Sequence, residues 1–331
     1  MAFSKLSCDE QGIVLGQLRN TLEPRLVMYF SSVSKELRAL LPPVARQQLR
    51  ADYEEATALC VKMGMRSCKE LREATEVDWE GKGLTAADLA TLAKLGSLLP
   101  ALEELILDGC TGSAGPDGVQ QLADGLIAGA LPAVTFLVIN SMHVGDAGAS
   151  ALAAALDRGA LPRLKVLDLG HAAIGDAALV ALAPALRRRP ALEDLCLYDN
   201  PFGDEGLAAL VPPPPPAGTP PPPAGGLKNL ELLNLNGSQV TDAGCAALVA
   251  ALDSGALPAL ERPAGGRKQL KWLDLRRTKV SDAGCAALAA VLDSGALPAL
   301  EGLEFFGTRA SAAAVEAVGE ALARSRGAAR S

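Results

Sequence analysis

Aromatic residues make up only 3% of this 331-residue sequence. Ala and Leu therefore supply most of a hydrophobic content of 49%. Helices that present such small side chains can pack closely against one another, as stacked elements require. The length alone would allow two globular domains, so the choice between a globule and an array depends on the pattern of the residues.

An excess of basic residues is also missing. The formal net charge is −7 and the pI is about 5.1, so nucleic acid, whose usual footprint is a basic face, is not an expected partner. Residues 1–11 lack the apolar core of a signal peptide, and no apolar run reaches about 18 residues. The seven cysteines include no C-x-x-C pair. We expect reduced thiols in a soluble protein of the cytoplasm or nucleus, with no membrane partner.

Catalytic and metal-binding motifs are absent as well. The two histidines, His143 and His171, each follow a predicted strand, and the spacing gives neither of them a nucleophile or an orienting group. The sequence contains no phosphate-binding G-x-x-x-x-G-K-[ST] loop and no zinc spacing, and its recurring Asp-Ala-Gly lacks the alternating carboxylates of a calcium loop. These absences predict a non-enzymatic protein without cofactor or metal.

A repeated motif, L-x-x-L-x-L with apolar substitutions, is what the sequence does contain. It begins at residues 102, 134, 164, 192, 230, 270 and 300, so the steps run from 28 to 40 residues. A degenerate earlier copy covers Ala74 to Trp79. A recurring unit of this length predicts a solenoid of stacked units.

Each unit reads as a short strand, a turn and a helix. The helix starts share an aspartate, as in Gly203-Asp204-Glu205-Gly206 and Thr241-Asp242-Ala243-Gly244, which we expect to complement the dipole of its own helix. The sequence therefore predicts an α/β solenoid with parallel strands on a concave face and helices on a convex face. The units resemble the leucine-rich repeat family, in its long, ribonuclease-inhibitor-like subclass, over residues 74–324. That resemblance implies the same fold but is not specific for function, because one fold hosts many functions.

Two insertions interrupt the period. Residues 211–226 hold two polyproline tracts, expected to form an extended loop that is either a docking site for an SH3 or WW domain or a tolerated low-complexity loop. Residues 261–269 form a polar Gly- and Pro-containing loop, and residues 325–331 form a basic tail.

The N-terminal 45 residues are predicted to be helical, followed by a helical connector over 46–73. Leu6-Ser7-Cys8-Asp9-Glu10 and Val33-Ser34-Lys35-Glu36-Leu37-Arg38 resemble the ends of an F-box, although Ser7 replaces the usual Pro and Leu37 the usual Trp. The resemblance implies docking to the linker subunit of a cullin-type ubiquitin ligase, through Ile13, Leu18, Val33 and Leu37. The alternative is a free-standing binding module or inhibitor, in which these helices only cap the array.

Alternation along each strand predicts the residues of the concave face. Several are aromatic, or polar in a way that suits specific recognition, and we predict that they bind a partner protein: Phe136, Asp168, Asp194, Tyr198, Asn234, Asn236, Trp272, Asp274, Arg276 and Phe306. The predicted centre of this surface is Tyr198, Asn234 and Trp272.

Overall fold

The protein is described from a computed structural model. The structure describes residues 21–22, 29, 43–108, 114–211, 227, 229–253, 270–295, 297 and 299–330. The F-box-like segment, the two polyproline tracts and the 261–269 loop lie outside the described residues, apart from isolated positions.

Eight short parallel strands form a single sheet in which chain order and spatial order are the same. The strands are β1 (Glu76–Asp78), β2 (Glu104–Ile106), β3 (Phe136–Val138), β4 (Val166–Asp168), β5 (Asp194–Cys196), β6 (Leu232–Asn234), β7 (Trp272–Asp274) and β8 (Gly302–Glu304). Register is constant, with Leu105 opposite Leu137 and Leu137 opposite Leu167. The predicted parallel solenoid, including the degenerate first repeat, is confirmed.

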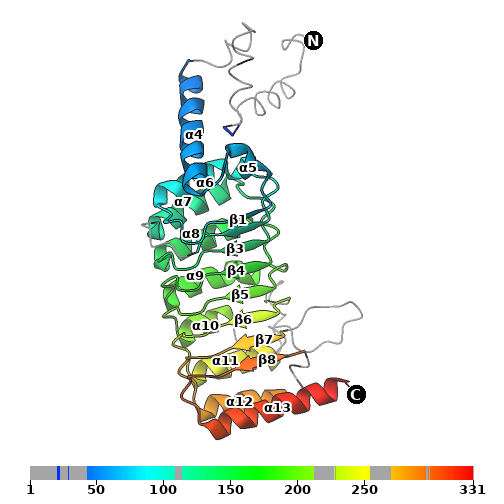
Figure 1. Ribbon diagram of the computed structural model, residues 1–331. Helices are drawn as coiled ribbons and strands as arrows, with labels where there is room; N and C mark the ends of the chain where they lie inside the picture. Colours follow the sequence, from blue (N-terminus) through cyan, green and yellow to red (C-terminus); the bar gives the residue numbers. More distant parts are fainter. Residues whose placement is uncertain are drawn as a thin grey trace, which may run out of the picture.

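The helices of the described residues are α4 (Pro43–Lys62), α5 (Cys68–Glu73), α6 (Ala86–Leu95), η2 (Gly96–Leu98), α7 (Gly115–Ile127), α8 (Gly145–Asp157), α9 (Asp176–Arg187), α10 (Asp204–Leu210), α11 (Asp242–Asp253), α12 (Asp282–Asp293) and α13 (Ala312–Arg330). Helices α6 to α12 lie along one side of this sheet, in the connections between strands, whereas α4 and α5 precede β1 and α4 projects beyond the end of the sheet (Figure 1). Helix α13 follows β8. The helix α10 is short because its pattern stops where the proline-rich insertion begins, as the sequence predicts. The core between helices and sheet is a continuous layer of Leu, Ala and Val.

Four of the eight strands end in a side chain that bonds the backbone of the following turn. Asp78, Asp168, Asn234 and Asp274 are each the third residue of a strand. Each accepts a hydrogen bond from the backbone amide two residues later, at 2.8–3.0 Å. This local bond competes with the extended ladder and starts the turn toward the helix.

The turn between β5 and α10 has a buried asparagine at its centre. Asn200 is 1% exposed, accepts the amides of Ala172 and Ile174, and donates to the Leu169 and Leu197 carbonyls. These bonds join two repeats through one side chain. The equivalent positions hold Ala172, Ser238 and Thr278, so neighbouring turns rely on fewer side-chain bonds.

The helix-start aspartates lie in the first turn of their own helices, as expected, but they also act between repeats, which the sequence did not predict. Asp204, in the first turn of α10, accepts the Thr241 amide at 2.8 Å and the Gly244 amide at 3.0 Å, both at the start of α11. Asp242 does the same for Ser281 and Gly284 at the start of α12, and Asp176 for Gly203 and Gly206. Each carboxylate therefore satisfies the free amides of the following helix.

The glycine that follows the aspartate by two residues is required by the same contact. A Cβ on Gly244 would lie 2.4 Å from Oδ1 of Asp204, and one on Gly284 would lie 2.6 Å from Oδ1 of Asp242. In the recurring Asp-x-Gly, the aspartate reaches forward to the next repeat and the glycine admits the aspartate of the repeat before.

The first helices are capped by nearby side chains. Thr85 and Asp88 form the full reciprocal capping box of α6. At α5, Ser67 accepts the Glu70 amide, and the Glu70 carboxylate accepts the Arg66 amide. The helical connector predicted over 46–73 contains most of α4 and all of α5. Among the residues that the structure describes, none of the helices combines the length and hydropathy of a bilayer span.

Replacing Asp242 by Ala is expected to lower the free energy of unfolding by about 2 kcal/mol, because three hydrogen bonds to the start of α12 are lost. Asp146→Ala is the control. It occupies the same place in α8 but accepts only the Gly175 amide, at 3.3 Å, so it should cost less. Urea denaturation followed by circular dichroism measures both, and equal losses would mean that the aspartates serve their own helices.

The difference in unfolding free energy between wild type and Asp242→Ala should depend on pH. Burial raises the pKa of Asp242, but hydrogen bonds from Ser281 and Gly284 outweigh it and hold the pKa below its usual value. A carboxyl with a lowered folded-state pKa stabilises the protein above its unfolded pKa and loses this effect as the pH falls through the folded value. The gap between wild type and Asp242→Ala should therefore be full at pH 7 and close below about pH 4.

Candidate functional site

The concave face of the sheet is the candidate site. Each repeat presents three positions there, namely the first and third residues of its strand and the residue two beyond the strand. The second residue of each strand is buried, except in β8, where it is half-buried. All ten residues predicted for the partner-binding surface occupy these concave positions.

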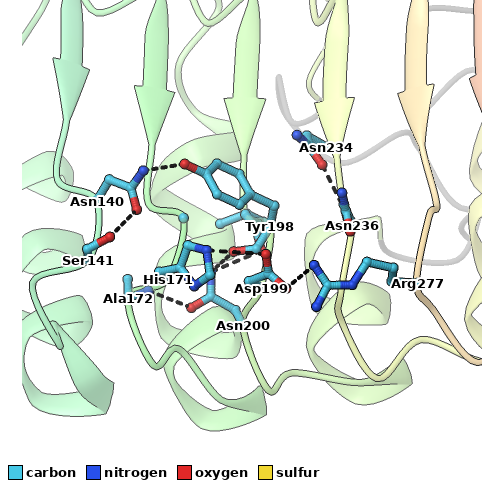
Figure 2. Close-up of polar contacts among 12 residues, drawn as sticks. Asn140, Ser141, His171, Ala172, Tyr198, Asp199, Asn200, Asn234, Asn236 and Arg277 are labelled. Carbon is cyan, nitrogen blue, oxygen red and sulfur yellow. Dashed lines mark hydrogen bonds and ion pairs between the residues drawn. The ribbon is translucent and has the colours of Figure 1, made fainter. Parts of the chain in front are cut away.

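Tyr198 lies across the neighbouring repeat. A Cβ on Gly170 would be 2.2 Å from Cζ of Tyr198, so the ring fills the space that this glycine leaves. The Asn140 amide donates a hydrogen bond to the Tyr198 hydroxyl, one repeat further (Figure 2). The ring is therefore fixed over three repeats, and its first role is to cover the sheet.

Trp272 leans in the opposite direction. A Cβ on Gly302 would lie 2.2 Å from Cε3 of Trp272, so the indole packs on β8 and remains 41% exposed. The predicted centre is therefore not one aromatic cluster, because Tyr198 turns toward β4, Trp272 turns toward β8, and Asn234 on β6 lies between them. Phe306, which follows β8, is 82% exposed.

Arg276 is held in place by its neighbour. Its guanidinium makes hydrogen bonds to both carboxylate oxygens of Asp274, with Nε–Oδ1 at 3.0 Å and Nη2–Oδ2 at 2.6 Å, and Asp274 is 2% exposed. These bonds also raise the pKa of Arg276. The Arg277 amide donates to the Phe306 carbonyl, so Arg276 and Phe306 are neighbours on adjacent repeats. A fixed guanidinium beside an exposed ring suits recognition of a protein surface.

A row of side chains at the carboxyl ends of the strands was not predicted as part of the site. Asp199 contacts His171 on one side, with Nε2–Oδ2 at 3.2 Å, and Arg277 on the other, with Nη1–Oδ1 at 3.4 Å (Figure 2). Asp199 reaches Arg277 across Gly237, where a Cβ would lie 2.2 Å from its Oδ1. His171, Asp199 and Arg277 have φ values of 47°, 51° and 54°, a region that favours glycine.

Two further groups were missed, although the sequence carried a signal for each. Glu76, Asp78 and Glu80 extend the concave face into the degenerate first repeat, and applying the same alternation to Ala74–Trp79 would have found them. The glycines at concave positions, Gly170 and Gly302, mark the places where a ring from the next or preceding repeat lies.

The centre of the concave face is electrostatically negative. Burial raises the pKa of Asp168, and the charge of Asp108 raises it further. Burial together with the charges of Asp168 and Asp108 raises the pKa of Tyr198 to about 12. Burial and the nearby carboxylates also raise the pKa of the Cys196 thiol to about 12. These shifts arise from burial and from repulsion between acids.

Several polar groups of this face are bonded to one another, and those described do not gather as metal ligands. Among the described residues, no three His, Cys, Asp or Glu side chains gather as a metal would need. A cleft of about 320 Å³ lies on the other side of the sheet, between α6 and α7. Its lining residues Lys94 and Asp124 are already bonded to Glu55 and Gln120, at 3.0 Å in each case.

Comparison with known proteins agrees with the fold. Two segments, 161–183 and 226–249, match the leucine-rich repeat family. No curated protein sequence matches the chain. An internalin C2 of Listeria monocytogenes is similar in structure at 19% identity, over 77% of this chain and 84% of that one, with a TM-score of 0.42.

Two other solved structures are similar at lower scores. An internalin, InlF, of the same bacterium is 13% identical over 81% of this chain and 93% of its own, with a TM-score of 0.29. The actin-binding site 2 of leiomodin-1 is 14% identical over 65% of this chain and 91% of its own, with a TM-score of 0.31. The stacked strand–turn–helix units, together with the two matched segments, give the fold of a leucine-rich repeat solenoid.

Cys196 should react slowly despite lying half-exposed on the concave face. A pKa near 12 leaves almost no thiolate at pH 8, so we expect alkylation by iodoacetamide at least tenfold slower than for a free cysteine. Mass spectrometry of the Cys196 peptide, native against guanidinium-unfolded, measures this rate. Asp168→Asn combined with Asp194→Asn should speed the native reaction. Native labelling at the rate of a free thiol would contradict the assignment.

Proposed function

We propose that this chain is a non-enzymatic module that binds a partner protein on the concave face of its leucine-rich repeats. The observation that carries the proposal is the pair of large aromatic side chains at the β7–β8 end, Trp272 and Phe306, which are 41% and 82% exposed. Trp272 is the first residue of β7, Phe306 follows β8 by two residues, and the Trp272 ring is packed against Gly302. Anchors fixed before binding lose little conformational entropy when a partner covers them.

The neighbouring polar groups support the same function. Arg276 is held by Asp274 and lies beside Phe306, so a cation and an aromatic ring are presented together. Aromatic residues and arginine are the residue types that dominate binding energy in protein interfaces. A plain solvated sheet face would instead carry single charged residues and small polar groups.

Trp272→Ala together with Phe306→Ala should weaken partner binding by at least 2 kcal/mol, about thirtyfold, while the fold is retained. Tyr198 is left unchanged because it is bonded to Asn140. To find the partner, a photoreactive phenylalanine derivative at position 306 should capture one defined protein from a cell extract. The same group at Val180, which is 42% exposed on α9, is the matched control. Capture of the same protein from both positions would contradict binding at the concave face.

The F-box resemblance of Leu6 to Leu40 supports a narrower form of this function. In it, the N-terminal helices dock the linker subunit of a cullin-type ubiquitin ligase, and the concave face presents a target for ubiquitination. The residues proposed for linker docking are Ile13, Leu18, Val33 and Leu37. The alternative, a free-standing ribonuclease-inhibitor-like module capped by these helices, uses the same concave face without the ligase.

Binding of the purified linker subunit to the full chain separates the two forms. If the adaptor role holds, the wild-type chain binds the subunit, and Leu18→Asp with Leu37→Asp abolishes binding because an apolar contact is replaced by charge. Trp272→Ala is the control and should bind the linker normally. A wild-type chain that does not bind the linker would leave the free-standing module as the function.

A further inference from the structure

The charges of the concave face are unbalanced. Its positions in the described repeats carry nine carboxylates and a single cation, Arg276, which is already paired with Asp274. The carboxylates are those of Glu76, Asp78, Glu80, Glu104, Asp108, Asp168, Asp194, Asp274 and Glu304. Five of the nine belong to the first two repeats. The N-terminal end of this face is therefore acidic, whereas the exposed rings lie at the other end.

The acidic end includes a like-charge pair that the fold does not require. Glu76 and Glu104 are register partners on β1 and β2, and both are exposed. Like charges directly opposite one another destabilise a sheet. A second such pair, Asp274 opposite Glu304 on β7 and β8, has Arg276 bonded to Asp274. Just before some strands, a lysine pairs with a glutamate of the neighbouring repeat. Lys271 lies 2.8 Å from Glu231, and Lys165 lies 3.5 Å from Glu193.

The field of these carboxylates extends along the face. Asp108 is in the second repeat, yet its charge raises the pKa of Asp168, two repeats away. It also raises the pKa of Tyr198, whose hydroxyl reaches back to Asn140 beside Asp108. A cation placed over this stretch would relieve the repulsion among several carboxylates at once. Because carboxylates and low-dielectric walls line it together, the face also attracts cations from a distance.

We propose that the partner docks on the concave face through a basic segment, with lysine or arginine side chains over β1–β2 and an apolar side chain on Trp272 and Phe306. This rests on the proposed protein-binding function and adds the chemistry of the partner. Charge complementarity selects the basic segment, because the concave positions of β1–β6 carry no lysine or arginine. The exposed aromatic end selects the apolar anchor.

The geometry also gives the spacing between the two parts of the segment. Six strand steps separate β1–β2 from β7–β8, and at about 4.8 Å per step they span roughly 29 Å. An extended chain covers about 3.3 Å per residue. A segment lying straight across the strands therefore places its basic cluster about nine residues from its apolar anchor.

Synthetic peptides test this on the full-length chain. The probe is a fluorescein-labelled peptide with four lysines, a Gly/Ser spacer of nine residues and a Leu-Phe end, made in both directions. Fluorescence anisotropy is measured at 50 and 300 mM NaCl. We expect binding in one direction that weakens at least tenfold at the higher salt, a further loss when the spacer is cut to three residues, and no binding when glutamates replace the lysines.

Matched charge-reversal variants locate the site. Glu76→Lys with Glu104→Lys should weaken the lysine peptide at least tenfold, and Glu76→Gln with Glu104→Gln should weaken it less. Glu54→Lys with Glu316→Lys is the control. It changes the net charge equally at exposed helical positions and should leave affinity within twofold. Thermal denaturation checks that each variant is folded. Trp272→Ala should reduce the affinity to that of a peptide lacking Leu-Phe.

Three results would overturn the inference: failure of the lysine peptide to bind at low salt, equal binding of the glutamate peptide, or equal losses in the two charge-reversal variants. If cross-linking from position 306 still captures one protein that Trp272→Ala releases, while reversal at Glu76 and Glu104 has no effect on it, the basic-partner inference fails and the concave-face function stands. If capture is the same from positions 306 and 180, both fail.

Discussion

A carboxylate that crosses from one repeat to the next is the contact on which this array depends. The first amides of every helix lack partners within that helix. Here Asp176, Asp204 and Asp242 supply them to the helix that follows. The starts of α10, α11 and α12 are thus completed by the preceding repeat, so these units depend on a neighbour both to bury their apolar face and to satisfy their backbone. The stacking that buries the Leu core and the bonding that caps the helices are the same event, and this links the stability of one repeat to the presence of the next.

The coupling between repeats also fixes the positions of the side chains on the concave face. The strands are three residues long and share a fixed register, and in four of them a final Asp or Asn bonds the amide two residues on. The concave side chains therefore have little freedom in position. The rings then lie where the sheet offers space. Tyr198 fills the hollow over Gly170, and Trp272 fills the one over Gly302. One of these rings is also bonded to Asn140, whereas the other keeps two-fifths of its surface open. An aromatic ring packed on a glycine is therefore a structural residue at Tyr198 and an exposed anchor at Trp272.

Features of the fold that depend on residues close together in the sequence could be predicted, whereas features that depend on contacts between repeats could not. The strands and their order can be predicted because apolar residues alternate within each motif and the repeat is long enough for only one strand and one helix, which must stack on its neighbours. Even the weak copy at Ala74–Trp79 was identified in this way. The true partners of Asp204 were not, because the amides of Thr241 and Gly244 lie 37 and 40 residues away and the alternative, the dipole of its own helix, explains the same residue. The repeat pattern also could not predict toward which neighbouring strand the Tyr198 and Trp272 rings turn. Alternation gives the face a side chain points to, but the direction along that face depends on which neighbouring repeat carries a glycine.

The two ends of the concave face differ in the range over which they act. Carboxylates at β1–β2 exert a field that reaches about a Debye length, roughly 8 Å at physiological ionic strength, beyond the surface, so they influence the approach of a partner. Trp272 and Phe306 act only in contact, where desolvation of their rings slows dissociation. Arg276 belongs to the second group in spite of its charge, because Asp274 neutralises it at close range and leaves a rigid, planar donor beside Phe306. The asymmetry of the chain, with acids in its first repeats and rings in its last, therefore gives the surface a direction, and a partner that uses both ends can fit in only one orientation.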